Sequence, residues 1–104
     1  MNIEQPLVFG TLQSSSQAIY TARSPLSNIE IGTIWLENVS SGLRVFSLGI
    51  MKNGVTTNLL TAIPLMSGYK ILVDKPIGLG LNDSIQGVAD INGAINFSIF
   101  GKSI

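Results

Sequence analysis

The chain has 104 residues, which suits one domain with a single core, and its six basic residues balance its six acidic ones. It contains no cysteine, which excludes disulfides, thiolate nucleophiles and zinc sites built on sulfur. The neutral balance and the scattered basic residues argue against nucleic acid or anionic lipid as a partner. Charged residues make up only 12% of the chain, so Ser, Thr and Asn must supply surface polarity that a partner can cover.

The first six residues differ from the rest of the chain. Met1 to Pro6 is short, acidic and interrupted by proline, so it does not read as a signal peptide. We expect residues 1–6 to be an N-terminal arm that reaches a neighbouring subunit, with Ile3, Glu4, Gln5 and Pro6 as interface residues. Residues 7–104 are expected to form one β-sandwich domain. The apolar runs that follow are far shorter than the roughly 18 residues of a membrane span, so we expect a soluble protein with no membrane partner.

Apolar residues recur at every second position along most of the chain, which predicts β-strands. Ile95, Phe97 and Ile99 alternate with Asn96 and Ser98, for example. The expected fold is an all-β, antiparallel β-sandwich, jelly-roll or Ig-like, with about eight strands. We place these strands at residues 7–12, 17–22, 28–38, 43–52, 57–63, 69–74, 84–90 and 94–101. The segment 57–63 also fits a helical turn that Pro64 would end.

Two features refine this pattern. Ile29 and Ile31 have one parity and Ile34 and Leu36 the other, so we expect a bulge at Gly32-Thr33 that returns both pairs to the same face. Asn53-Gly54 and Asn92-Gly93 each lie between apolar runs and predict hairpin turns of type I′, in which both central residues need positive φ. Gly78-Leu79-Gly80 is interpreted as a flexible strand exit.

The residues offer little support for catalysis or a cofactor. Without histidine or cysteine, a nucleophile would need an unusual base, and the spacing of the six carboxylates does not pair them for glycosidase-like chemistry. A calcium site at Asn82, Asp83 and Asp74 lacks a loop of alternating acidic positions, and turn capping is the simpler interpretation. Asn38-Val39-Ser40 and two similar triplets match the glycosylation pattern by coincidence. We expect no enzyme activity, no cofactor and no metal.

Trp35 and Phe46 are the large side chains expected to anchor the core. Trp35 has the parity opposite to Ile34 and Leu36, however, which would turn it toward a neighbouring subunit. We therefore add Trp35 to the candidate interface residues.

Several of these segments together resemble small virion proteins of tailed bacteriophages. The resemblance runs from about Phe9 to Gly101 and departs from the common pattern at Arg23-Ser24-Pro25 and at Asn82. It rests on the segments 18–22, 31–40, 44–50, 77–85 and 95–101.

The resemblance implies a structural protein of the virion that assembles in the host cytoplasm and lies on the capsid surface. Its job would be capsid cement or decoration, with the major capsid protein or another virion protein as partner. Such proteins act as homo-oligomers, often trimers. The alternative is a tail or fibre component that binds a host receptor or carbohydrate, and a cellular adaptor domain ranks last.

Overall fold

The computed structural model describes residues 4–23 and 28–103, and these residues form nine β-strands. No helix occurs in this part of the chain, so the expected all-β class is confirmed. In chain order the strands are β1 (Gln5–Thr11), β2 (Gln17–Thr21), β3 (Asn28–Asn38), β4 (Arg44–Lys52), β5 (Val55–Leu65), β6 (Lys70–Val73), β7 (Ile77–Gly80), β8 (Ser84–Ala89) and β9 (Ile95–Ser103).

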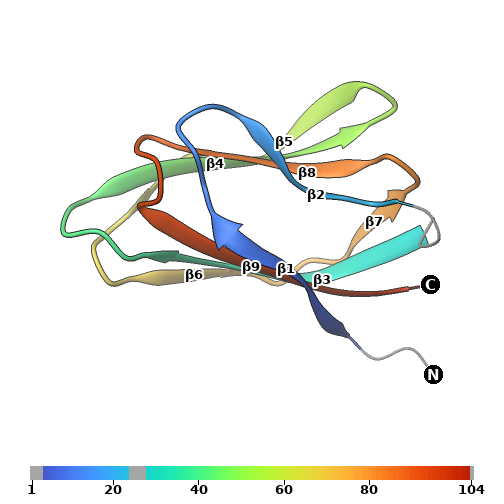
Figure 1. The fold of residues 1–104 in the computed structure, drawn as a ribbon, viewed down its shortest axis with the longest axis horizontal. Coiled ribbons are helices and arrows are strands. Elements are labelled where there is room, and N and C mark those ends of the chain that lie inside the picture. The colour runs from blue at the N-terminus through green and yellow to red at the C-terminus, as the bar shows by residue number, and fades with distance from the viewer. Residues whose placement is uncertain (1–3, 24–27, 104) are drawn as a thin grey trace.

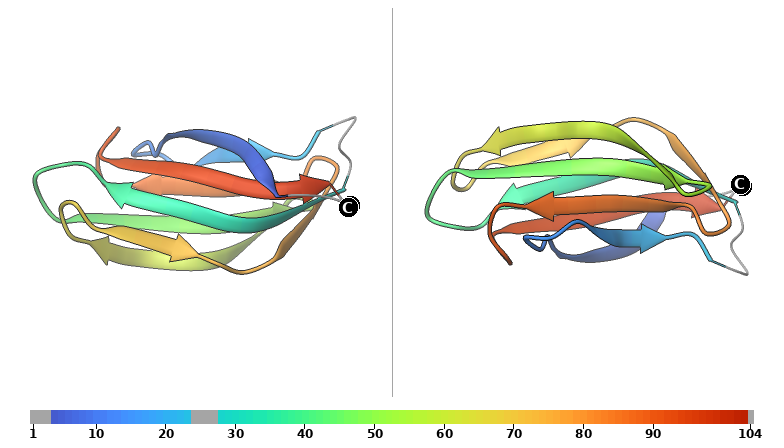
Figure 2. Two further views of the ribbon diagram at one scale, coloured as in Figure 1. Left: turned by 90° about the horizontal axis from the view of Figure 1, so that it is seen from below. Right: turned by 90° about the horizontal axis from the view of Figure 1, so that it is seen from above.

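The strands form two antiparallel sheets that stack as two layers (Figures 1 and 2). Sheet A has the order β1-β9-β3-β6, with β7 also paired to β3, and sheet B has the order β2-β8-β4-β5. The early strands pair with the late ones in reverse order, as β1 with β9, β2 with β8, β3 with β6 and β4 with β5. This nesting around the β4–β5 hairpin defines a jelly roll, so the choice between jelly-roll and Ig-like topology is settled.

The core lies between the sheets and follows the period-two pattern. Ile34 and Leu36 of β3 are fully buried, while Trp35 between them is 43% exposed. Phe46 is the largest fully buried side chain, so it anchors the core as expected. The expectation that Trp35 does the same is wrong, because its side chain projects from the outer face of sheet A.

The bulge in β3 is confirmed. The pairing of β3 with β9 shifts register between Ile31 and Thr33, so Ile29 and Ile31 are buried together with Ile34 and Leu36. The bulge also marks the point where β3 changes its partner at the edge of sheet A. Before the bulge β3 pairs with β7, and after it β3 pairs with β6.

Strand β7 was not expected. Ile77 and Leu79 alternate with glycines and are 6% and 2% exposed, so the supposed flexible exit is a buried edge strand. Its two glycines hid a short period-two signal. The less certain segment 57–63 is a strand, not a helical turn, and it extends to Val55–Leu65.

The two Asn-Gly turns have different outcomes. Asn53 and Gly54 have φ of 52° and 77° and join β4 to β5 as a two-residue hairpin, with Lys52 paired to Val55. The prediction of a hairpin at Asn92-Gly93 is wrong, because β8 belongs to sheet B and β9 to sheet A. Only Gly93 of that turn has a positive φ, and the segment crosses between the sheets instead of folding back within one.

Candidate interaction surface

An apolar row crosses the outer face of sheet A from edge to edge. Paired positions place Phe9 of β1 beside Ser98 of β9, Ser98 beside Trp35 of β3, and Trp35 beside Leu72 of β6. Phe9 is 79% exposed and Leu72 is 51% exposed. We call this row, together with Phe100 one step further along β9, the apolar band. Large exposed apolar side chains gathered on one face are typical of interaction surfaces.

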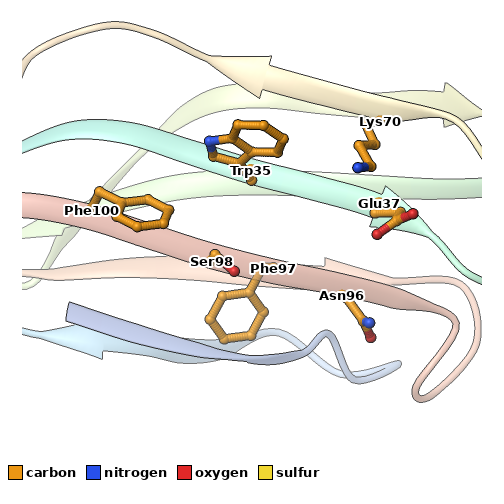
Figure 3. Close-up of a pocket in the computed structure, with 7 residues that line it drawn as sticks. All are labelled: Trp35, Glu37, Lys70, Asn96, Phe97, Ser98 and Phe100. Carbon is orange, nitrogen blue, oxygen red and sulfur yellow. The ribbon is translucent and has the colours of Figure 1, made fainter. Parts of the chain in front are cut away.

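A shallow hollow of about 280 Å³ lies within the apolar band (Figure 3). Trp35 and Phe100 line one part of it, Ser98 the middle, and Glu37, Lys70 and Asn96 the other end. The Lys70 Nζ lies 5.6 Å from the centroid of the Trp35 ring, close enough for a cation–π attraction. Phe97 also lines the hollow, which therefore combines three aromatic residues with polar groups at one end.

Charged side chains border the apolar band on both sides along the strands. Glu37 and Lys70 occupy paired positions on one side, and Lys102 and Glu30 lie on the other, with Nζ and Oε1 3.6 Å apart. An apolar centre inside a polar rim is the usual anatomy of a protein–protein interface. The geometry of this face thus suits a protein partner.

Gln5 and Pro6, which were expected in the N-terminal arm, lie at one edge of the same sheet. Gln5 and Pro6 open strand β1 and pair with Gly101 and Phe100, so the first strand begins two residues earlier than expected. Proline is tolerated there because β1 is an edge strand. The Glu4 carboxylate fills the space beside Gly32 that a Cβ would occupy. Ile3 lies outside the described residues, and the role of this segment in an interface stays a prediction.

A second apolar surface lies at one end of the sandwich, where the β3–β4, β5–β6 and β8–β9 connections meet (Figure 1, left). Five large apolar side chains in these connections are between 46% and 60% exposed. We call this surface the loop end. Its apolar residues are Val39, Leu43, Met66, Tyr69 and Ile91.

The loop end is held rigid by Asn38, which is fully buried. Its Nδ2 donates to the carbonyls of Leu65 at 2.7 Å and Gly42 at 2.8 Å, and its Oδ1 accepts from the backbone N–H of Ser40 at 2.9 Å. Backbone bonds from Asn38 to Tyr69 and from Val39 to Ala94 join the three connections. The connections are therefore presented as a fixed surface. In the folded chain the Asn38 amide is buried and is not accessible as a glycosylation acceptor.

Two of the described carboxylates have structural partners, because Glu30 pairs with Lys102 and Asp83 caps a turn. The Asp83 carboxylate accepts from the N–H of Gly80 at 2.9 Å, which is the turn capping expected for it. In residues 4–23 and 28–103, acidic side chains do not gather in a group of three that could hold a metal ion. Burial raises the pKa of Tyr20, which packs against the core from β2, above its ordinary value of 10.0. Within the same residues, no helix has the length and hydropathy to span a membrane.

Sequence reasoning found Trp35 on this surface but missed its neighbours Phe9, Leu72 and Phe100. The sequence signal for an outward position was parity, because Phe9 and Leu72 share the outward positions of their strands with polar residues. Cross-strand register was needed to show that these side chains lie together. Asn38 carried a similar signal, because it continues the inward parity of Ile34 and Leu36.

Comparisons with known proteins show similarity at the level of fold. No protein-family model and no curated protein matches this sequence. Among solved structures, a chain of the T13 infectious bursal disease virus particle has a TM-score of 0.59 at 12% identity, covering 98% of this chain and 30% of that one. A chain of the Gx strain of the same virus has a TM-score of 0.51 at 9% identity, covering 96% and 33%.

A third similar structure comes from the Bacillus endospore appendages, described as a family of disulfide-linked pili. Its TM-score is 0.55 at 12% identity, and the match covers 98% of this chain and 87% of that one. This chain spans about a third of the viral chains it resembles. The fold class defined here is thus a jelly roll shared with chains of virus particles and of a surface appendage.

Proposed function

We propose that this chain is a non-enzymatic structural protein of a virion that works by binding neighbouring proteins. The observation that carries the proposal is the concentration of exposed apolar side chains on two surfaces, the apolar band and the loop end. Scattered exposed apolar residues would need no explanation, but patches bordered by polar groups are typical of binding surfaces. The fold supports the proposal, because a jelly roll is also found in chains of a virus particle.

The specific role we propose is capsid cement or decoration in a tailed bacteriophage, as the resemblance of the sequence implies. The protein would lie on the capsid surface after assembly in the host cytoplasm and would bridge subunits of the major capsid protein. It would do so as a homo-oligomer, for which the resemblance implies a trimer. The residues proposed to take part in these contacts are Ile3, Glu4, Gln5, Pro6 and Trp35.

We assign the loop end to the major capsid protein. The Asn38 hydrogen bonds fix the backbone at Gly42 and Leu65, so the connections lose little backbone conformational entropy when a partner covers them. Many weak contacts of this kind, repeated by the symmetry of a shell, add up to firm attachment. The mechanism is therefore burial of apolar area at many equivalent positions, with no chemical step.

One observation favours the alternative, a tail or fibre protein that binds carbohydrate. The hollow beside Trp35 presents an aromatic ring next to Glu37, Asn96 and Lys70, and sugars bind through ring stacking combined with hydrogen bonds. Copy number separates the two roles. A head protein is present in as many copies as the capsid lattice has equivalent positions, and a tail part only in a handful.

The test is quantitative mass spectrometry of density-purified particles. The particles are assembled with either the natural protein or the double variant M66S/Y69S at the loop end. The proposal expects lattice-scale copy number for the natural protein and strong loss of the variant from particles. The matched control is Val55→Ser, which removes a 66% exposed apolar side chain at the first residue of β5. The hairpin that joins β4 to β5 lies at the end of the sandwich opposite to the loop end (Figure 1). Full incorporation of the loop-end variant, or absence of the natural protein from particles, would contradict the proposal.

A further inference from the structure

The central strands of sheet A carry an unusual pattern on their outer face. β9 and β3 lie side by side, and each paired position joins two side chains that differ in size or in charge. In one pair an acid faces a base, in two pairs a large ring faces a small side chain, and in one pair an amide faces a carboxylate. The pairs are Lys102 with Glu30, Phe100 with Thr33, Ser98 with Trp35, and Asn96 with Glu37.

From this pattern we propose that the apolar band binds a second copy of this chain through a two-fold axis that runs along the strands between β9 and β3. Such an axis places β3 of one copy over β9 of the other. Equivalent residues of the two copies stay at the same level along the strand direction. Each outer-face side chain of β3 then faces, from the other copy, the same β9 residue with which it is paired in its own copy. Trp35 lies over Ser98 and Lys102 lies over Glu30, so bulk meets space and opposite charges meet.

The hollow beside Trp35 fits this arrangement. Ser98 lines the middle of the hollow, so the indole of the second copy enters a space of about 280 Å³ that is already bounded by Trp35 and Phe100. The two-fold axis makes the insertion mutual, and each copy fills the hollow of the other. Aromatic side chains set into pockets at the centre of an interface commonly dominate its binding energy.

The other two-fold arrangement of facing sheets, with the axis across the strands, is disfavoured by charge. That axis would invert the height along β3 and bring Glu37 of one copy toward Glu30 of the other. Like charges directly opposite each other destabilise a contact. The charges paired between β3 and β9 therefore favour the axis along the strands.

Size and net charge permit the contact. The molecule measures 40 × 29 × 18 Å, so its broad face can bury the roughly 800 Å² per partner of a stable interface. The formal net charge is zero, so two copies approach without mutual repulsion. Both conditions are met by a copy of this chain without any further partner.

The inference rests on the proposed function and gives the apolar band and the loop end separate tasks. Because the axis runs along the strands, both loop ends of the dimer point in the same direction. Two copies then attach to a shell side by side, and each attachment strengthens the other. The smallest assembly in solution becomes a dimer, in place of the trimer that the resemblance implies.

The first test is sedimentation equilibrium of the full chain. We expect a dimer that dissociates on dilution, and a monomer at roughly 100 µM, or a trimer, would overturn the inference. The chain has a single tryptophan, so the emission of Trp35 reports the contact without any mutation. Emission should shift to the red as the dimer dissociates, and emission independent of concentration would overturn the inference.

The second test fills the space that the partner's indole needs. Ser98→Trp should weaken the dimer about tenfold or more while the circular dichroism spectrum stays unchanged, since Ser98 lies on the outer face. Gln86→Trp, on a central strand of sheet B, is the matched control and should leave the dimer intact. A dimer that tolerates Ser98→Trp as well as the control would exclude this face.

A charge exchange completes the test. Glu30→Lys and Lys102→Glu each place like charges together across the axis and should weaken the dimer, and the double variant E30K/K102E should restore it. Failure of restoration would contradict the proposed facing of β3 and β9. These measurements use solution assembly alone, so a monomeric protein that still enters particles would refute the dimer and leave the proposed function standing.

Discussion

Trp35 and Ser98 occupy paired positions at the centre of the outer face of sheet A, one on β3 and the other on β9. The pair sets a large half-exposed ring beside a small hydroxyl, directly above a core whose residues Ile34 and Leu36 are fully buried. Core packing and the proposed binding surface thus involve alternate residues of one strand. This separation makes both roles open to experiment.

Trp35→Ala should lower the free energy of unfolding by only about 1 kcal/mol, because the side chain is half-exposed and its contact with Lys70 is on the surface. Leu36→Ala, one residue further along, should cost about 3 kcal/mol through the cavity it leaves in the core. Urea unfolding measures both. Equal losses would show that Trp35 is a core residue and not part of a binding surface.

Asn38→Ala should destabilise the protein by about 3 kcal/mol. The change removes the donor to the buried Leu65 carbonyl and to Gly42, and a buried acceptor without a partner costs about 1–3 kcal/mol. Ser40→Ala is the comparison, because it removes a hydroxyl that donates to Asn38 Oδ1 but keeps the amide in place, and its loss should be smaller. If the two variants lost the same free energy of unfolding, Asn38 would not be the residue that organises the loop end.

Gly101→Ala should be strongly destabilising, by about 2 kcal/mol or more, because the new Cβ would lie 2.6 Å from the Glu30 carbonyl oxygen on the neighbouring strand. Gly78→Ala in β7 is the control, since a Cβ there meets no atom within 4 Å. Thermal unfolding followed by circular dichroism compares them. A Gly101→Ala protein that melts with the control would mean that β9 and β3 are not packed as closely as described.

The partly buried Tyr20 gives stability a pH dependence at the alkaline end. Its pKa is raised in the folded state by burial, whereas in the unfolded chain it ionises near 10.0. The stability linked to this group is therefore fully present below about pH 10 and is lost as the pH rises toward the folded-state pKa. Urea unfolding at about pH 9 and about pH 11 should show a larger loss for the natural protein than for Tyr20→Phe. Equal losses would mean that Tyr20 is solvated.

The all-β fold could be predicted from the sequence because burial on one face of a strand imposes a local rhythm. The bulge at Gly32-Thr33 was predictable for the same reason, since Ile31 and Ile34 differ in parity. The nesting of β1 with β9 and of β2 with β8 was not, because these pairs form between residues far apart in the chain. The Asn92-Gly93 turn shows the limit, since its local chemistry favours a hairpin but its flanking strands belong to different sheets.

The candidate site was predictable only in part. Trp35 stood out because an aromatic ring at an outward position is uncommon. Phe9, Phe100 and Leu72 join it only through cross-strand register, which the local pattern does not contain. The loop end depends on the same long-range information, because its apolar residues come from three connections that meet in space.

A cryo-EM map of the intact particle tests the central claim most directly. The account predicts pairs of these jelly rolls at lattice positions, with the Trp35 rings of each pair buried between facing A sheets and both loop ends seated on the shell. Single copies with the outer face of sheet A open to solvent, or a shell without this protein, would contradict it.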